Sequence, residues 1–230
     1  MKLSGASMAR PYVILNAAMT LDGKIATAGG DSRISCEEDL DRIHKLRASV
    51  DAVMVGFGTV LADDPSLTVR RARGENPLRV IIDSFGKTPG DAKILDGSAR
   101  TIIAVTARAS KRDLDRLRAK GAQIIAVGWK EVDLQKLLKK LHALGVRRLL
   151  LEGGSTLNWG MLKQGLVDEV RVAVAPYIIG GTGARTLVGG QGVTKVSKGV
   201  TLKLISVTRV GKDLLLTYRV KGVGVAPKAG

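Results

Sequence analysis

The stretch of sequence that decides the fold is Val55-Gly56-Phe57-Gly58-Thr59-Val60-Leu61-Ala62-Asp63-Asp64-Pro65-Ser66-Leu67-Thr68-Val69-Arg70. An apolar run at residues 50–55 leads into it and predicts a buried strand, and the glycines that follow let the backbone approach a ligand closely. Thr59 is suited to cap a short helix, and Pro65 excludes Asp64 from helical geometry. The carboxylates of Asp63 and Asp64 are therefore expected where a helix has just ended.

Arg70 closes this stretch and adds a cation that can make a forked contact with a phosphate group. Backbone donors, acids and an arginine thus lie within sixteen residues. Judged by spacing alone, an ordinary strand, turn and charged loop that bind no ligand account for this pattern equally well. The rest of the chain has to decide between these two interpretations.

Length and composition predict one domain, since 230 residues with 45% apolar content suffice for one substantial core. We expect an N-terminal extension at residues 1–10, a single domain at 11–220 and a disordered tail at 221–230. No run of about 18 uncharged apolar residues occurs, and residues 1–8 lack the apolar core of a secretory signal. The sequence therefore predicts a cytoplasmic protein with no contact to a membrane.

The cysteine and histidine content argues against metal chemistry. Cys36 is the single cysteine and only His44 and His142 accompany it, so neither an internal disulfide nor a zinc site is expected. Cys36 is interpreted as a residue at the start of a helix rather than as a nucleophile, because no histidine and acid are suggested beside it.

The net charge of +16 is the outlying compositional feature and suggests an anionic partner. Basic residues are spread from Arg10 to Lys228 without a dense cluster, and aromatic residues make up only 3% of the chain. A surface that stacks nucleic-acid bases is therefore not expected. Binding of nucleic acid remains as an alternative hypothesis, and small anionic ligands are favoured.

Strand-like and helix-like patterns alternate along most of the chain, which predicts an α/β fold with a mostly parallel sheet flanked by helices. A closing β-hairpin is expected from two alternating runs joined at Gly211 and Lys212. The expected strands lie at 12–19, 50–55, 78–83, 101–106, 122–127, 148–151, 166–174, 201–210 and 213–220. The expected helices begin at the caps Ser35, Ser110 and Asp133 and after Gly154.

Two polar residues within these elements allow more than one interpretation. Asn16 interrupts an apolar strand, so its amide must be hydrogen-bonded either to backbone or to a ligand. Arg47 falls in the last turn of a helix, where it either compensates the helix dipole or binds an anion.

A second informative stretch runs from a buried strand at 148–151 through Glu152 and a double glycine into a helix. Free N–H groups of Ser155 and Thr156 then face whatever lies above the sheet, which predicts a cradle for a phosphate group. The spacing matches neither the P-loop nor the three-glycine dinucleotide pattern. Glu152 lies at the carboxyl edge of the sheet, where α/β proteins bind ligands, although an acid bonded to the loop backbone is the alternative.

Together these motifs resemble the riboflavin-biosynthesis reductases, which are related in fold to dihydrofolate reductase. The resemblance spans residues 11 to about 182 and combines Thr-Leu-Asp-Gly-Lys-Ile-Ala at 20–26, Gly-Thr-Val-Leu-Ala-Asp-Asp-Pro-Ser-Leu-Thr at 58–68, Leu-Glu-Gly-Gly-Ser at 151–155 and Ala-Pro at 175–176 before Gly-Gly at 180–181. The second and third motifs in combination are specific to the family, whereas either alone is weak.

The resemblance implies NADPH-dependent reduction of a ribosylamino-pyrimidine 5′-phosphate to its ribitylamino form. The deaminase motifs that precede the bacterial reductase domain are missing, so the chain looks like the stand-alone archaeal or fungal type. The implied substrate is 2,5-diamino-6-ribosylamino-4(3H)-pyrimidinone 5′-phosphate, and the implied assembly is a homodimer. NADH remains possible as the cofactor.

The resemblance also implies which residues form the site. The positions that match cofactor contacts are Ala18, Thr59, Asp63, Ser84, Gly153, Gly154, Ser155 and Thr156. The positions that match or lie beside substrate contacts are Ser32, Arg47, Leu67, Arg70 and Glu152. The candidates for catalysis are Asp63, Glu152 and Asn16, the last at a place where some bacterial relatives carry lysine.

The implied chemistry suits these residue types. Hydride leaves the nicotinamide for C1 of the sugar after the ribosylamine opens to an imine, and a nearby acid favours the protonated imine. Asp63 and Glu152 are the candidates for that acid, with their roles not separated. A related reductase that acts on a pterin or another small molecule is the main alternative.

Overall fold

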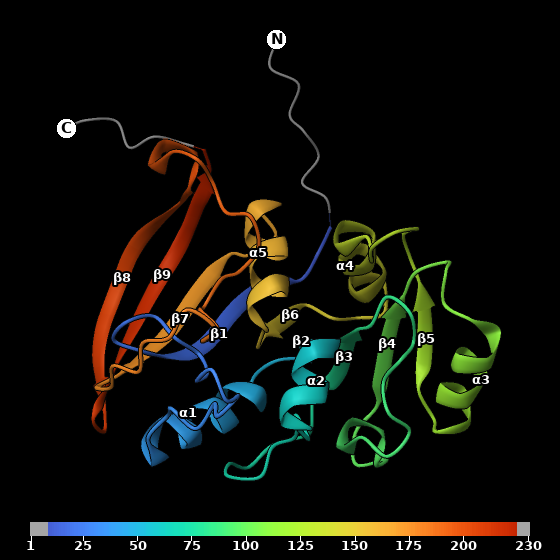
Figure 1. Cartoon of the computed structure of the whole chain (residues 1–230). Coiled ribbons are helices and arrows are strands. Elements are labelled where there is room, and N and C mark those ends of the chain that lie inside the picture. The colour runs from blue at the N-terminus through green and yellow to red at the C-terminus, as the bar shows by residue number, and fades with distance from the viewer. Residues whose placement is uncertain (1–8, 225–230) are drawn as a thin grey trace.

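A single nine-stranded sheet forms the centre of the computed structural model, which describes residues 9–224 (Figure 1). The strand order is β5-β4-β3-β2-β6-β1-β7-β9-β8, and the seven strands from β5 to β7 are parallel to one another, whereas β9 is antiparallel to β7 and β8. The strands are β1 (Tyr12–Thr20), β2 (Ala52–Gly56), β3 (Leu78–Ile82), β4 (Thr101–Val105), β5 (Gln123–Ala126), β6 (Arg148–Leu151), β7 (Glu169–Ala175), β8 (Val200–Val210) and β9 (Asp213–Val223). The mostly parallel sheet and the C-terminal hairpin of β8 and β9 are as predicted from the sequence.

Helices cover both faces of the parallel part of the sheet, and each face has its own apolar core. One core includes Leu137 and Leu138 of α4 and Met161 of α5, and the other includes Leu46 of α1 and Val60 of α2. The helices are α1 (Glu37–Arg47), α2 (Phe57–Asp63), α3 (Lys111–Ala119), α4 (Leu134–Ala143) and α5 (Ser155–Lys163), with short 3-10 helices η1 (Lys93–Leu95) and η2 (Val196–Lys198). Asn16 and Glu152 lie on the face that α1 covers, where their side chains meet arginines of that helix.

Two helix starts differ from the expectation. The residue that precedes α1 is Cys36 rather than Ser35, whose hydroxyl instead donates to Asp39 at 2.7 Å. In α2 the N-cap is Gly56, so Thr59 lies inside the helix and caps nothing. Asp63 is the last residue of α2 and Asp64 follows in the left-handed region, which agrees with the expectation that Pro65 ends the helix there.

The ends of the domain also differ from the expectation. Strand β9 continues to Val223, so residues 221–223 belong to the sheet rather than to a disordered tail. Arg10 forms an ion pair with Asp168 at 2.6 Å, so this residue belongs to the folded domain rather than to an extension. The predictions for residues 1–8 and 225–230 lie outside the described residues. Strand β7 begins at Glu169, and the buried Leu166 and Val167 precede it as a loop.

The turn of the C-terminal hairpin is anchored on the first turn of α1. Asp213 is fully buried, and its Oδ2 accepts a hydrogen bond from the backbone N–H of Cys36 at 3.0 Å. The Cys36 thiol donates to the carbonyl of Val210 at 3.2 Å, and burial raises the pKa of this thiol. A side chain on Gly211 would collide with Glu38. Gly211 has a φ of +57°, in the left-handed region that favours glycine, and the turn packs closely against the Glu38 side chain.

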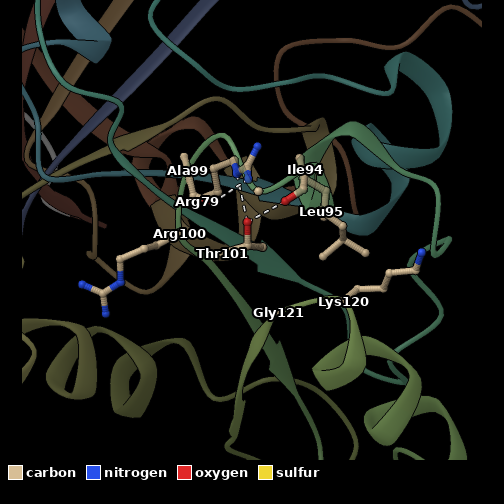
Figure 2. Close-up of a pocket in the computed structure, with 9 residues that line it drawn as sticks. Arg79, Ile94, Leu95, Ala99, Arg100, Thr101, Lys120 and Gly121 are labelled. Carbon is tan, nitrogen blue, oxygen red and sulfur yellow. Dashed lines mark hydrogen bonds between the residues drawn. The ribbon is translucent and has the colours of Figure 1, made fainter.

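A pocket of about 230 Å³ lies at the amino ends of β3 and β4, away from the edge where the sequence places the ligands (Figure 2). Its inner wall includes Arg79, whose side chain is fully buried. Arg79 donates to Thr101, to the carboxylate of Asp96 and to several backbone carbonyls, so its guanidinium is saturated by the protein itself. We interpret Arg79 as a structural anchor for the segment that includes η1.

Within residues 9–224, no helix is long and apolar enough to cross a membrane. The same part of the chain contains no group of three or more His, Cys, Asp or Glu side chains placed to hold a metal ion.

Candidate active site

The loops that follow β2 and β6 meet at the carboxyl edge of the sheet. The N–H of Gly56 donates to the carbonyl of Gly153 at 2.8 Å, which joins the start of α2 to the turn before α5. A Cβ atom on Gly154 would lie 3.2 Å from Oγ1 of Thr59. The structure therefore brings together Thr59 and the turn at Gly153 and Gly154, two predicted cofactor sites that are 94 residues apart in the sequence.

The N-terminus of α5 is free to bind an anion. Its N-cap is Gly154, no side chain caps the helix, and Gly153 has a φ of +93°, in the left-handed region that favours glycine. The N–H groups of Ser155 and Thr156 belong to the first turn, where α-helices leave backbone donors without intrahelical partners. Uncapped donors and the helix dipole suit a phosphate group, so these residues fit the phosphates of a dinucleotide cofactor.

Asp63 lies one turn after Thr59 on the same face of α2. Its Oδ1 accepts a hydrogen bond from the hydroxyl of Ser32 at 3.2 Å, and both residues are exposed to solvent. Ser32 comes from the loop between β1 and α1, so the contact joins a predicted substrate position to a predicted cofactor position. Among the residues that the structure describes, no hydrogen bond or ion pair engages Oδ2 of Asp63.

Arg47 and Glu152 form a two-point ion pair across the α1 face of the sheet. Nε and Nη2 of Arg47 donate to the two carboxylate oxygens of Glu152 at 2.8 and 2.7 Å. The two side chains are only 11% and 12% exposed, and Nη1 of Arg47 also donates to the carbonyl of Thr68 at 3.2 Å. Burial by itself would lower the pKa of Arg47, but the charge and hydrogen bonds of Glu152 outweigh it and raise the pKa.

This ion pair excludes the alternative in which Glu152 is bonded to the loop backbone alone, whereas ligand binding by Arg47 and Glu152 stays a prediction. Arg47 does more than compensate a helix dipole, and Glu152 is bonded to a side chain rather than to the loop backbone. Because Arg47 is bonded to Glu152, Arg70 is the more accessible of the two arginines that were predicted to bind an anion. Arg70 is exposed, and a single guanidinium N–H group, on Nη1, donates to the Thr68 hydroxyl at 3.1 Å.

His44 supports the backbone at Arg70. Its Nδ1 accepts a hydrogen bond from the Arg70 N–H at 3.0 Å. Burial, followed by the charges of Arg47 and Arg70, lowers the pKa of His44. A neutral imidazole is the state that accepts this hydrogen bond, so the lowered pKa agrees with the geometry.

Three predicted positions are not joined to these contacts. Leu67 is 1% exposed and belongs to the core, so any ligand contact there has to come from its backbone. Ala18 lies on β1 two residues beyond Asn16, on the same face of the strand. Ser84 follows β3, and its carbonyl accepts hydrogen bonds from the N–H and the hydroxyl of Thr106.

Asn16 is held by a side chain that the sequence analysis did not single out. It is 4% exposed, and its Oδ1 accepts a hydrogen bond from Nη2 of Arg42 at 2.9 Å. Nε of Arg42 donates to Asp39 at 2.7 Å, and the Asp39 side chain is fully buried. Asp39 looked like an ordinary acid in the first turn of a helix. Its spacing of three residues from Arg42, on the side of α1 that faces the sheet, was the signal available.

Comparison with known proteins gives a family. The model of the RibD C-terminal domain matches residues 11–216. The chain belongs to the RibD C-terminal domain family. This confirms the resemblance inferred from the motifs, although the matched region continues through most of the hairpin.

Relatives in the RibD C-terminal domain family include both short and long proteins. The chain is 54% identical over 216 residues to a protein of Methanothermobacter thermautotrophicus named 2,5-diamino-6-ribosylamino-4(3H)-pyrimidinone 5′-phosphate reductase, covering 93% of this chain and 100% of that protein. RibD of Acinetobacter baumannii has a TM-score of 0.81 with 29% identity, covering 94% of this chain and 59% of that one. Dihydrofolate reductase of Enterococcus faecalis has a TM-score of 0.54 with 10% identity, covering 92% of this chain and 97% of that one. The last similarity concerns the fold alone and confirms the dihydrofolate reductase-like class.

Proposed function

We propose that this protein catalyses the NADPH-dependent reduction of the ribosyl side chain of 2,5-diamino-6-ribosylamino-4(3H)-pyrimidinone 5′-phosphate to the ribitylamino product. The observation that carries this proposal is the similarity, over 93% of this chain and 100% of the other, to the archaeal protein with that reductase name. The geometry supports it. The N-terminus of α5, which suits a phosphate group of a dinucleotide, lies next in sequence to the buried ion pair of Arg47 and Glu152, because Glu152 directly precedes the Gly153–Gly154 turn.

The cofactor side of the site consists of the α5 turn and one face of α2. The backbone donors of Ser155 and Thr156 would hold phosphate oxygens, while Thr59 and Asp63 line the same place from α2. NADPH supplies a hydride to the substrate when it is bound there. Preference for NADPH over NADH agrees with the net charge of +16, which favours the ligand that carries one more phosphate group.

On the substrate side, Arg70 would anchor the 5′-phosphate, because it is exposed and, within residues 9–224, its guanidinium bonds to the Thr68 hydroxyl alone. Glu152 would bind and orient polar groups of the substrate from a fixed position, since Arg47 holds both of its oxygens. Asp63 retains one carboxylate oxygen without a partner among residues 9–224 and is therefore the better placed of the two carboxyl groups to exchange a proton with the substrate. Most of the rate enhancement would come from holding donor and acceptor together.

We also propose a homodimer. The edge strand β8 exposes apolar side chains, including Leu204 at 50%, Ile205 at 52% and Val207 at 55%. Exposed apolar side chains on a long edge strand usually mark a surface that another chain covers. Sedimentation equilibrium would test this, since the wild type should have twice the mass of one chain and Val207→Glu should shift the mass toward that of one chain. A wild type that sediments as a single chain would contradict the proposal.

The deciding experiment is oxidation of NADPH followed at 340 nm after addition of the diamino pyrimidine phosphate, with the deaminated pyrimidine tested in parallel. Faster turnover of the diamino compound would support the proposed reaction before deamination. Preference for the deaminated compound would keep the reaction and reverse that order. Tight NADPH binding without oxidation by either pyrimidine would indicate a reductase of another small molecule. Retention of the protein on DNA, without NADPH binding, would instead support the nucleic-acid-binding hypothesis.

A further inference from the structure

Asn16 and Glu152 are neighbours on adjacent parallel strands. The register pairs Leu15 with Leu151, so the next residues along β1 and beyond β6 lie side by side and point to the same face. On that face each meets an arginine of α1: Arg42 contacts Asn16, and Arg47 contacts Glu152. One helix thus holds two polar side chains that adjoin the proposed cofactor turn.

The contact with Arg42 determines how the Asn16 amide is oriented. A guanidinium can only donate hydrogen bonds, whereas an amide carries an acceptor oxygen at one end and an NH₂ donor at the other. With Nη2 of Arg42 at 2.9 Å, the atom of Asn16 that faces it has to be Oδ1. Nδ2 therefore points away from Arg42, and no acceptor among residues 9–224 is bonded to it. The strand presents a hydrogen-bond donor beside Glu152.

Arg42 is itself held firmly in this position. Its Nε donates to Oδ1 of the fully buried Asp39 at 2.7 Å, and Oδ2 of Asp39 accepts from the Ser35 hydroxyl at 2.7 Å. Nη1 of Arg42 is buried and has no partner among the described residues. An apolar side chain in place of Arg42 would leave the fully buried carboxylate of Asp39 without its cation, so Arg42 contributes to stability as well as to the orientation of Asn16.

We propose that Arg42 is a positioning residue that fixes the amide of Asn16, so that Nδ2 donates a hydrogen bond to an acceptor atom of the substrate. This inference rests on the proposed function for the presence of the pyrimidine beside Glu152. Asn16 then binds the substrate directly, and Arg42 acts through it without touching the substrate. The competing explanation is that the Arg42–Asn16 contact merely fastens α1 to β1.

Three variants separate these explanations. Asn16→Asp keeps the contact and turns it into an ion pair, but it removes the donor at the position of Nδ2. Arg42→Lys keeps a side chain that can only donate, whereas Arg42→Gln offers an amide that can accept as well as donate and so lets Asn16 turn over. Arg118→Gln is the matched control, because Arg118 also pairs with an acid three residues earlier on a helix, in α3.

The experiment measures kcat and KM for the diamino pyrimidine phosphate, the Kd for NADPH and the thermal midpoint of all four variants. We expect Asn16→Asp to lower kcat/KM at least about tenfold with no loss of thermal midpoint, and Arg42→Gln to lower it about tenfold, the size expected for one substrate hydrogen bond. Arg42→Lys should remain within about threefold of wild type. Arg118→Gln should match wild type, and NADPH binding should be unchanged in every variant.

Two results would overturn the inference. One is full activity of Asn16→Asp, which would show that no donor is needed there. The other is equal loss of activity in Arg42→Lys and Arg42→Gln in parallel with their loss of stability, which a fastening role predicts. A wild type that oxidises no NADPH with either pyrimidine would instead refute the proposed function, so the two failures are distinguishable.

Discussion

Removing either partner of the buried Arg47–Glu152 ion pair should destabilise the protein strongly, and removing both should not. Arg47→Met leaves a carboxylate that is 12% exposed without its partner, and Glu152→Leu leaves a guanidinium whose remaining partner among the described residues is the carbonyl of Thr68. Loss of one partner of a buried pair costs about 3–5 kcal/mol, whereas apolar replacement of both is often neutral. Because both side chains retain about a tenth of their exposure, we expect about 3 kcal/mol for each single variant.

The assay is a double-mutant cycle by urea unfolding, with thermal unfolding in parallel. Each single variant should lower the thermal midpoint by about 6–12 °C, and Arg47→Met/Glu152→Leu should unfold within about 1 kcal/mol of wild type at an unchanged denaturant slope. The coupling energy should then be about 5 kcal/mol or more. The exposed pair Arg118–Asp115, with side chains 54% and 53% exposed, serves as the control and should give less than about 1 kcal/mol.

Additive effects of the two single variants would refute this reasoning, because they would mean that the pair contributes nothing beyond its separate side chains. The double variant has a second use. It should be stable and yet fail to reduce the pyrimidine substrate, which would separate the role of the pair in the site from its role in the fold.

Three further predictions follow from single contacts. Gly154→Ala places a Cβ atom 3.2 Å from Oγ1 of Thr59, so calorimetry should show that NADPH binds about tenfold more weakly. Unchanged affinity would mean that the turn shifts to make room for the methyl group. The lowered pKa of His44 means that the unfolded chain binds a proton first as the pH falls, so its contribution to stability is present above the ordinary pKa of 6.5 and lost below it. His44→Asn keeps an acceptor for the Arg70 N–H, so its thermal midpoint should fall less than that of wild type as the pH is lowered below 6.5. Equal falls in the two proteins would contradict the role given to His44. The thiol of Cys36 is buried, and burial raises its pKa, so it should react with iodoacetamide far more slowly in native protein than in urea. Similar rates in the two conditions would show that the thiol is accessible.

The sequence was sufficient for the architecture because most of the parallel strands are short, largely apolar runs bounded by glycine or polar residues. β4, for example, is buried at all five positions. Boundaries were less predictable where tertiary contacts override local signals. Thr59 looked like a helix cap, but the link between Gly56 and Gly153 places the helix start three residues earlier. The buried Leu166 and Val167 read as strand because burial and strand pairing have the same apolar signature.

The candidate site was predictable as a set of residues and unpredictable as a set of contacts. The glycine turn and the acid after α2 follow from local backbone chemistry and from the family motifs. The pairing of Arg47 with Glu152 joins residues 105 apart, and nothing local indicates that partner. Arg42 was missed for the same reason, since its contact with Asn16 depends on how α1 crosses the sheet.

The anchoring of the C-terminal hairpin on α1 has a consequence for how the protein is made. The contact between Cys36 and Asp213 joins residues 177 apart, so α1 gains its final support only after nearly the whole chain has left the ribosome. Every family motif has been synthesised well before that point, yet the backbone N–H of Cys36, at the start of the helix that carries Arg42 and Arg47, still lacks its partner Asp213. Such late, distant contacts slow folding and prolong the exposure of apolar surface. A chain that stops before residue 213 would therefore contain all the candidate residues of the site and still lack the contact that holds their supporting helix in place.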